Sequence, residues 1–177
     1  VVDAHSPPPL DMVAAGHPFT RRHTSRRAHV DLPRMAQGGV DAPFFSVYVA
    51  PYYGEGARAV RRARTLIAEV KRQVATTDSA AMAYSAADVR RLTKNGTDAI
   101  LMGLEGGHAL AASPDTLQAL ANAGIRYVTL THVNTNRWAD SSQDAPQHDG
   151  LNALGRTMVR TMNDAGVLVD LAHVSDS

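Results

Sequence analysis

The chain has 177 residues, of which 44% are hydrophobic and 20% are charged. This composition is typical of a folded domain with a hydrophobic core and argues against disorder. The formal net charge of +1 gives no support to a nucleic-acid or anionic-membrane partner. Because the chain has no cysteine, disulfides and thiolate-bound metals are excluded, and any metal would be bound by His, Asp or Glu. No apolar run approaches the ~20 residues of a transmembrane helix.

The first residues predict a strand, Val1–His5, that ends in a histidine. Three prolines follow within Ser6–Leu10, so this stretch is expected to be neither helix nor central strand. Residues 11–29 are polar and rich in Arg and His. At a net charge of +1, we interpret them as a solvated loop and not as a binding site for phosphate or a carboxylate substrate.

The middle of the chain alternates between strand and helix signals. Residues 44–49 form a β-branched and aromatic run that predicts a second strand. Ser85 and Ser113 are expected to be N-caps, the second followed by a proline at the first helical position. Met158 and Met162 fall on the apolar stripe of the last helix and are expected in the core. Apolar periodicity and these caps predict helices at residues 56–76, 86–95, 114–123 and 151–164.

The apolar stretch of residues 98–104 ends in Glu105, Gly106 and Gly107. A short apolar run bounded by turn residues is typical of a strand buried on both faces, as in a parallel sheet. Burying a carboxylate at the end of such a strand is costly unless a cation or donor compensates it. Glu105 is therefore a candidate site residue.

Three other predicted strands also end in a polar side chain. Residues 125–132 end in His132, residues 166–173 end in His173, and the first strand ends in His5. A single histidine of this kind is more often structural than functional. Parallel α/β folds, however, gather their functional groups at the carboxyl ends of the strands. The sequence therefore predicts that the three histidines and Glu105 share one site.

The order of elements predicts an α/β fold with a parallel sheet and helices outside it. Five strands in 177 residues give about 35 residues per unit, and eight such units would need roughly 280 residues, the size of a (β/α)₈ barrel. A doubly wound open sheet is disfavoured, because prolines and not a glycine-rich turn follow the first strand. We therefore expect a TIM-like (β/α)₈ barrel truncated to about its first five βα units.

Several segments together resemble the membrane (renal) dipeptidase family of zinc metallopeptidases. The strongest are Leu104–His108, Arg126–His132 and Val169–Ser175, and the resemblance covers essentially the whole chain in the order of the family. Each motif alone is weak, whereas the ordered set is specific. The remaining motifs that carry the resemblance are Asp3–His5, Asp31–Arg34, Gly38–Val40 and Trp138–Ser142.

The resemblance implies a barrel with two zinc ions at its carboxyl face and a metal-activated water that cleaves dipeptides, often with a D-residue on the C-terminal side. It implies that His5 ligates the first zinc, that Glu105 bridges both and that His173 ligates the second. His132 would bind the substrate near the scissile carbonyl, so that Glu105 and His132 are the catalytic residues. Residues 1–177 are then expected to form a single metal-dependent hydrolase barrel domain that is incomplete at its C-terminus.

One departure from the family pattern concerns the first zinc. The family has an aspartate two residues after its first-strand histidine, and this chain has Pro7, whose side chain cannot bind a metal. This departure leaves open a non-catalytic remnant that binds peptide. Another amidohydrolase-type metal hydrolase is a further alternative, although the first strand, His5-Ser6-Pro7, lacks the second histidine of an HxH pair. A sheet that lacks strands also exposes an edge and apolar surface, which favours association into a homodimer.

Overall fold

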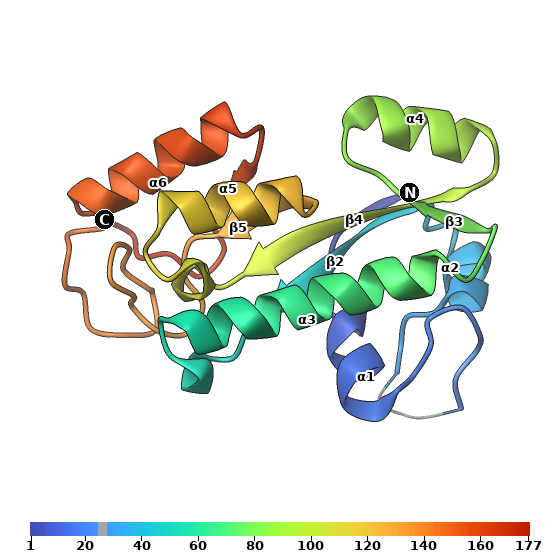
Figure 1. Cartoon of the computed structure of the whole chain (residues 1–177), viewed down its shortest axis with the longest axis horizontal. Helices are drawn as coiled ribbons and strands as arrows, with labels where there is room; N and C mark the ends of the chain where they lie inside the picture. The colour runs from blue at the N-terminus through green and yellow to red at the C-terminus, as the bar shows by residue number, and fades with distance from the viewer. Residues whose placement is uncertain (25–27) are drawn as a thin grey trace. The chain divides into compact units, whose positions relative to one another are not determined.

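The computed structural model describes residues 1–24 and 28–177 (Figure 1). The chain divides into two compact units. The first unit comprises Val1–Val47 and Thr65–Met102, and the second comprises Tyr48–Arg64 and Gly103–Ser177. The prediction of one domain over residues 1–177 stays a prediction. Among the described helices, none combines the length and the apolar character that crossing a membrane requires.

The first unit contains a parallel sheet with strand order β1-β2-β4, and β3 also pairs with β4 in parallel. The predicted strands at its start and at residues 44–49 are confirmed, whereas β3 is an additional strand of three residues. Helix α3 and strand β4 have residues in both units. The elements are β1 (Val2–Ser6), α1 (Pro8–Ala15), α2 (Leu32–Gly38), β2 (Ala42–Tyr48), α3 (Ala57–Val74), β3 (Ala80–Met82), α4 (Ala86–Lys94) and β4 (Asp98–Glu105).

The proline-rich stretch after β1 was predicted to be non-helical, and this prediction is wrong. Pro8 and Pro9 occupy the first turn of α1 and are buried. The first N–H groups of a helix have no partner within it, so a proline there costs no hydrogen bond and already has a helical φ. Gly16, in the left-handed conformation, ends the helix.

Strand β2 and helices α3 and α4 follow the predicted signals, whereas helix α2 was not predicted. The Ser85 hydroxyl accepts a hydrogen bond from the Asp88 backbone N–H at 3.1 Å, which is the expected N-cap of α4. On α3, the predicted apolar stripe is buried, with Leu66 and Val70 fully inaccessible to solvent. Phe45 of β2 is also fully buried and meets Phe19 edge to face, with ring centroids 5.4 Å apart.

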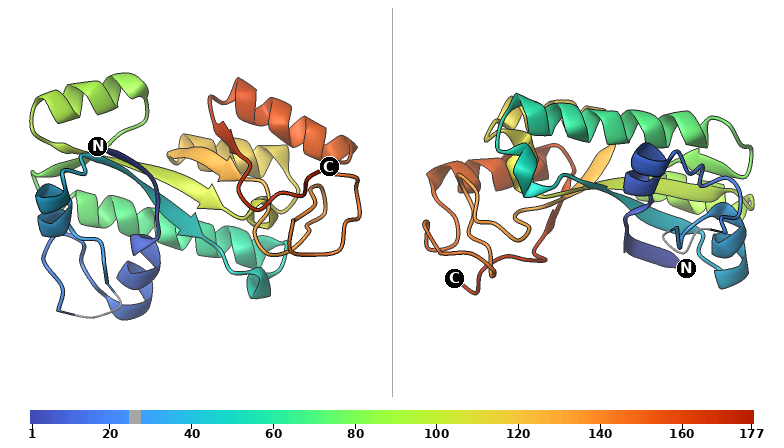
Figure 2. Two further views of the ribbon diagram at one scale, coloured as in Figure 1. Left: turned by 180° about the vertical axis from the view of Figure 1, so that it is seen from behind. Right: turned by 90° about the horizontal axis from the view of Figure 1, so that it is seen from below.

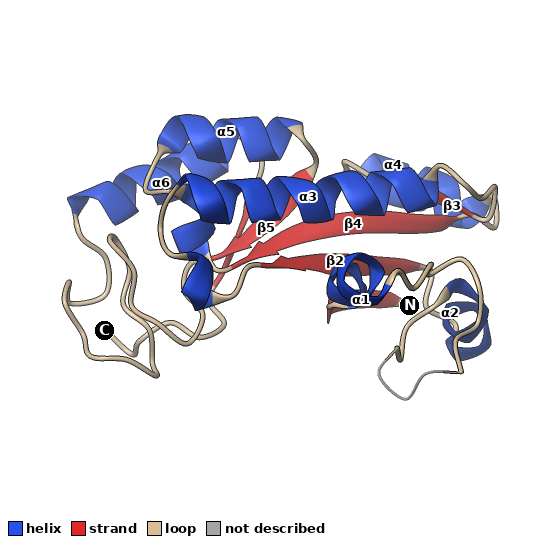
Figure 3. Cartoon of the chain, turned by 60° about the horizontal axis from the view of Figure 1, so that its bottom comes forward, coloured by secondary structure: helices blue, strands red, loops and turns tan. Residues whose placement is uncertain are grey.

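In the second unit the strand order is β4-β5-β6, and its helices α5 and α6 pack against β5 and β6, respectively (Figure 3). Ser113 caps α5 as predicted, accepting from the Thr116 backbone N–H at 3.2 Å. Met158 and Met162 of α6 are fully buried, as expected for core residues. Its remaining elements are the 3₁₀ turns η1 (Pro51–Tyr53) and η2 (Gly107–Leu110), α5 (Pro114–Asn122), β5 (Ile125–Thr129), α6 (Ala153–Asp164) and β6 (Leu168–Asp170).

Both histidine-bearing strands of the second unit are shorter than predicted. β5 ends at Thr129 and β6 ends at Asp170, so His132 and His173 lie in the turns three residues beyond the strand ends. The Thr129 hydroxyl donates to the Asp170 carboxylate at 2.6 Å, and the Leu130 N–H donates to the Asp170 carbonyl at 3.2 Å. These bonds join the ends of β5 and β6, so the two turns that follow begin side by side.

Asp98, at the start of β4, predicts a pH dependence of stability. Burial, together with the Asp41 carboxylate, raises the pKa of Asp98 to about 6. The folded state therefore holds this proton more tightly than the unfolded chain, so the stability from protonated Asp98 is present below about pH 4 and is lost as the pH rises through about 6. We expect Asp98→Asn to raise the melting temperature at pH 7.5 and to change it little at pH 4.

A matched control is Asp78→Asn, which alters an aspartate in the turn before β3 and should leave the melting temperature unchanged at both pH values. A lower melting temperature of Asp98→Asn at pH 7.5 would show that ionised Asp98 stabilises the fold.

Candidate metal centre

Glu105, His132 and His173 lie together in the second unit. Each offers one ligand atom, and these three atoms all lie within 4.8 Å of one another. The Nε2 atom of His132 is 3.4 Å from Oε1 of Glu105, and the rings of His132 and His173 are 4.5 Å apart between centroids. The structure thus brings together three of the four residues that the sequence singled out.

The turn after β4 fixes the position of Glu105, which is buried at the end of the strand. Gly106 has φ +106°, a conformation that side chains with a Cβ rarely adopt. At Gly107, a Cβ atom would lie 2.4 Å from both the Leu130 carbonyl oxygen and the Trp138 ring. Two consecutive glycines therefore let the chain pass close to Trp138 and leave the carboxylate at the site.

His132 is held through its backbone and its ring. Its carbonyl oxygen accepts a hydrogen bond from the Ser141 hydroxyl at 2.6 Å. Its ring meets Tyr48, the last residue of β2, edge to face with centroids 4.9 Å apart. Burial raises the pKa of Tyr48, and the charges of Glu105 and Tyr52 raise it further. Tyr48 is therefore a neutral phenol at neutral pH and contributes no negative charge to the site.

His173 has a backbone φ of 68°, which is uncommon for a residue other than glycine. Its carbonyl oxygen accepts hydrogen bonds from the Thr131 hydroxyl at 2.8 Å and from the Ser142 N–H at 3.0 Å. Backbone conformations of this kind persist where surrounding contacts impose them, and they cluster at functional sites. Here the contacts turn the His173 side chain toward His132 and Glu105.

The loop between β5 and α6 is organised by the carboxylate of Asp140, which is buried. This carboxylate accepts backbone N–H groups of Gln147, His148 and Gly150 at 2.8–3.1 Å. Burial alone would raise the pKa of Asp140, but these donors stabilise the charged form and leave its pKa below the usual value. The Asp140 carbonyl also accepts the Ser175 N–H, which joins this loop to the segment after β6 (Figure 2).

Asp140→Asn is expected to lower the free energy of unfolding by about 2–3 kcal/mol, since an amide cannot accept all three donors and hydrogen bonds to charged groups are the stronger ones. Urea denaturation at pH 7 measures the change. Because the pKa of Asp140 is lowered on folding, its stabilisation is present above the unfolded pKa and is lost as the pH falls through the folded one. The difference between wild type and variant should therefore shrink in acid.

Asp149→Asn provides the control for that measurement. Asp149 is exposed in the same loop with φ 54°, which asparagine also tolerates, so its replacement should be nearly neutral. If Asp140→Asn and Asp149→Asn lower the free energy of unfolding equally, the hydrogen bonds of Asp140 do not stabilise the loop.

Two further residues of the site were not recognised in the sequence. His108 is buried in η2, and burial is the main reason that its pKa is lowered, so its imidazole is neutral at pH 7. Tyr48 had a partial signal, because it is the last residue of the observed β2 and lies one residue before the end of the strand predicted at residues 44–49, close to the kind of position that singled out Glu105.

His5 lies on β1 in the first unit and is exposed. It is not a member of the group formed by Glu105, His132 and His173, and its role as a ligand stays a prediction. Pro7 directly follows β1 and occupies the N-cap position of α1, where its side chain carries no ligating atom.

The donor set of the centre is one carboxylate and two imidazoles. These ligand types suit Zn²⁺ and related transition metals, and a set of no more than three protein ligands leaves coordination positions open, as in catalytic zinc sites. The arrangement fits a bound divalent metal, because the carboxylate supplies negative charge and the imidazole nitrogens can serve as ligands. A cation is therefore favoured there over a neutral ligand.

Comparison with known proteins agrees with this chemistry. A model of the family "Membrane dipeptidase (Peptidase family M19)" matches residues 1–177. The chain is 40% identical over 157 residues to the dipeptidase tcpJ of Claviceps purpurea and 34% identical over 166 residues to dipeptidase 3 of Rattus norvegicus. These matches cover 84% and 91% of the chain but only 37% and 32% of the two relatives.

The fold is also that of solved dipeptidase structures. The probable dipeptidase PvdM from Pseudomonas aeruginosa matches with a TM-score of 0.86 and 25% identity, over 99% of this chain and 47% of its own. A Rhodobacter sphaeroides metallopeptidase liganded with a phosphinate mimic of L-Ala-D-Ala has a TM-score of 0.84 at 21% identity, over 99% of this chain and 59% of its own. The predicted α/β class and truncated TIM-like barrel are confirmed.

The family model covers every residue of the chain, and relatives in a fungus and a mammal share a third or more of the aligned residues. These findings confirm the resemblance seen in the sequence. The chain belongs to the membrane dipeptidase family, peptidase family M19.

Proposed function

We propose that this protein is a zinc-dependent dipeptidase that hydrolyses the peptide bond of dipeptides. The observation that carries the proposal is the convergence of Glu105, His132 and His173, whose ligand atoms lie within 4.8 Å of one another. Membership of the dipeptidase family supports the same reaction. The chain spans less than half the length of the curated relatives it matches, so the activity of the whole protein is part of the proposal.

Three residues are proposed to hold zinc: His5 at the first ion, Glu105 bridging two ions, and His173 at the second. A shared carboxylate would offset the repulsion between two cations, and neutral imidazoles add no excess negative charge. When bound, zinc supplies an activated water and polarises the scissile carbonyl. The protein contributes the placement of these groups, since the glycine turn fixes Glu105 and two hydrogen bonds fix the backbone of His173.

His132 is proposed to contact the substrate beside the scissile carbonyl. A ring N–H there would donate a hydrogen bond to the oxygen on which negative charge develops. Packing against Tyr48 and the bond from Ser141 restrict the ring before substrate arrives, so little ordering remains to be done on binding.

The proposed substrates are dipeptides, including those with a D-residue on the C-terminal side. Support comes from the Rhodobacter sphaeroides structure, whose ligand is a mimic of the dipeptide L-Ala-D-Ala. Association of this chain into a homodimer stays a prediction. Leu168 and Leu171, on and just after β6, are 63% and 64% exposed and give the apolar surface on which such an association would depend.

A second candidate function, a non-catalytic protein that binds peptide, is favoured by one observation. Pro7 occupies the place where the family has an aspartate ligand, and it has no metal-binding atom. If the first zinc is lost for this reason, the second ion and the substrate contacts would bind a peptide without cleaving it.

Hydrolysis of Gly-D-Ala and Gly-L-Ala by the zinc-loaded protein, followed by amino-acid chromatography, separates these functions. We expect cleavage that chelation abolishes, and a loss of about 100-fold in kcat for His132→Ala with its zinc content retained. His29→Gln, at an exposed histidine of the first unit, is the control and should keep full activity. Peptide binding without cleavage would establish the second candidate, and cleavage of simple amides or lactones in preference to dipeptides would indicate another metal hydrolase.

A further inference from the structure

We propose that the loop after β2 and the first turns of α3 form a subsite for an acidic side chain of the substrate, with Arg58 and Arg62 binding its carboxylate. Such a subsite rests on the dipeptidase function proposed above, and it gives that function a preference for dipeptides that contain Asp or Glu. Residues 48–64 belong to the second unit, as does the candidate metal centre.

The loop after β2 starts next to the candidate metal centre. Tyr48, the last residue of β2, meets the ring of His132 with centroids 4.9 Å apart. The backbone N–H of the next residue, Val49, donates to the Glu105 carbonyl oxygen at 3.3 Å. Consecutive Cα atoms are about 3.8 Å apart, so the Cα atom of Tyr52 lies within about 15 Å of that of Tyr48. The turn η1 therefore follows β2 at the edge of the sheet where the site lies.

Two tyrosines of η1 stack on each other in this loop. The rings of Tyr52 and Tyr53 have centroids 4.7 Å apart and planes inclined by 31°. Tyr52 is 72% exposed, although Tyr53 restrains its ring. Exposed aromatic rings of this kind are typical of binding surfaces, because a rigid ring buries area against a ligand at little cost in entropy. Tyr52 therefore offers a face to the aliphatic part of a substrate side chain.

The second ring of the stack, Tyr53, also holds two arginines. The guanidinium carbons of Arg58 and Arg62 lie 5.0 Å and 5.7 Å from its ring centroid, within the range of cation–π contacts. Four residues separate the two arginines on α3, so they share one face of the helix. The hydrogen bond from Arg58 to the Tyr52 carbonyl oxygen is long, at 3.5 Å. Guanidinium groups held in this way keep N–H groups for a carboxylate, which they bind with two parallel hydrogen bonds.

The charges of these arginines are not balanced by acidic residues. Residues 57–64 contain four arginines and no Asp or Glu. Among the residues that the structure describes, neither Arg58 nor Arg62 forms a salt bridge. The carboxylate of Glu55, the acidic residue just before α3, accepts the Arg137 backbone N–H at 3.0 Å. Both guanidinium groups can therefore pair with an acidic ligand.

Electrostatic interactions link the arginines to the loop beside the site. The pKa of Tyr52 is raised, first by its side-chain hydrogen bond with Tyr53. The positive charges of Arg62 and Arg58 act in the opposite direction, so both lie near the Tyr52 hydroxyl. Burial raises the pKa of Tyr48 most, and Tyr52 adds to the increase. Because Tyr52 is a neutral phenol at neutral pH, it does not repel a carboxylate that reaches the arginines.

Competition between Gly-D-Glu and Gly-D-Gln for the zinc-loaded protein, with the products separated by chromatography, gives the ratio of their kcat/KM values. The pair Glu-Gly and Gln-Gly reports on the other position of the dipeptide. In at least one pair we expect the acid to be preferred about 10-fold, as for one charge-assisted hydrogen bond. Arg58→Gln and Arg62→Gln should each reduce this preference to about 3-fold or less. The preference should also shrink in about 0.5 M NaCl, since salt screens exposed charges.

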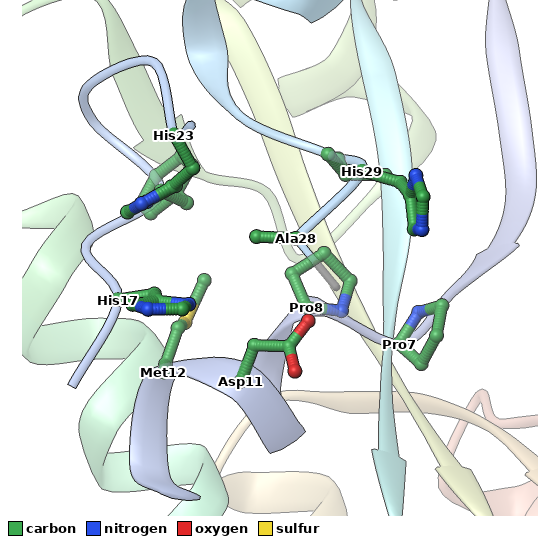
Figure 4. A pocket seen from close by; sticks show the side chains of 10 residues that line it. Pro7, Pro8, Asp11, Met12, His17, His23, Ala28 and His29 are labelled. Atoms are coloured by element: carbon green, nitrogen blue, oxygen red, sulfur yellow. The ribbon is translucent and has the colours of Figure 1, made fainter. Parts of the chain in front are cut away.

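Arg64→Gln is the matched control, because it makes the same change in net charge on the same helix. Arg64 is exposed about 120° round α3 from Arg58, and its replacement should leave the preference unchanged. His29→Gln, at the cavity beside α1 in the first unit, is a second control with the same expected result (Figure 4). Circular dichroism of each variant identifies a loss of fold.

A ratio near 1 in both pairs, or a preference that persists in both Arg58→Gln and Arg62→Gln, would overturn the subsite. Cleavage without a preference for acids would leave the dipeptidase proposal intact. If the protein binds dipeptides without cleaving them, calorimetric titration with the same pairs gives the preference as a ratio of Kd values. A 10-fold ratio there would support the subsite while the dipeptidase proposal fails, and absence of both cleavage and binding would overturn the two together.

Discussion

Glu105→Gln is expected to weaken zinc binding at the candidate metal centre by about 100-fold or more. A neutral amide oxygen is a poor ligand for zinc, and the substitution removes the only carboxylate of the group. Loss of groups that merely support a ligand already costs about 10–100-fold, so loss of a ligand costs at least as much. Competition with a chromophoric chelator measures the affinity.

Glu69→Gln is the matched control for this experiment. Glu69 lies on α3 and pairs with Arg72 at 2.7 Å, and it belongs to no group of metal-ligating side chains among the described residues. Its replacement should leave the zinc affinity unchanged. If Glu105→Gln binds zinc as tightly as Glu69→Gln does, Glu105 is not a ligand.

Gly107→Ala is expected to destabilise the second unit by about 3 kcal/mol or more, at the upper end of the range for overpacked cores. The new methyl group would lie 2.4 Å from the Leu130 carbonyl oxygen and 2.4 Å from the ring of Trp138. Neither can move easily. The carbonyl already accepts the Asn136 amide at 2.8 Å, and Trp138 is fully buried. Urea unfolding followed by tryptophan fluorescence reports on this unit, because Trp138 is the single tryptophan.

Gly56→Ala tests whether any glycine replacement has this effect. A Cβ atom at Gly56, just before α3, would have no heavy atom within 4 Å, and its φ is not in the left-handed region. We expect it to be neutral or slightly stabilising, since alanine restricts the unfolded chain. Equal unfolding free energies for the two variants would show that the turn after Glu105 is not tightly packed.

The regular elements were predictable because their signals are local. Strand β4 occupies residues 98–105 as predicted, since a short continuous apolar run bounded by turn residues is typical of a buried strand. Ser85 and Ser113 also identified the starts of their helices. Each accepts a hydrogen bond from a backbone N–H only three residues further on, so the signal is local. The short strand β3 was missed because three residues are too few to show a periodicity.

The errors have equally local causes. Three prolines were interpreted as a helix breaker, although in α1 they stand at the start of the helix, where proline is favoured. The strands β5 and β6 were predicted to reach their histidines, because apolar residues continue beyond the last paired residues. In the structure the chain turns after Thr129 and Asp170. A histidine after the strand still reaches the site, since turns that follow neighbouring parallel strands begin at the same edge.

The sequence predicted which side chains converge at the candidate site, but not the residues that hold them in place. Glu105, His132 and His173 each follow a recognisable strand, so their convergence required only the rule for parallel sheets. Asp140 lies far from a strand end, and its three backbone bonds form only once the loop has closed on itself. Contacts of this kind depend on tertiary structure, for which the sequence of the loop gives no periodic signal.

The most direct test of the account is anomalous diffraction at the zinc absorption edge from crystals of the zinc-loaded protein. We predict a peak at the candidate metal centre, about 2.0–2.2 Å from a ring nitrogen of His173 and from a carboxylate oxygen of Glu105. A fully loaded crystal with no anomalous peak beside these two residues would contradict the account.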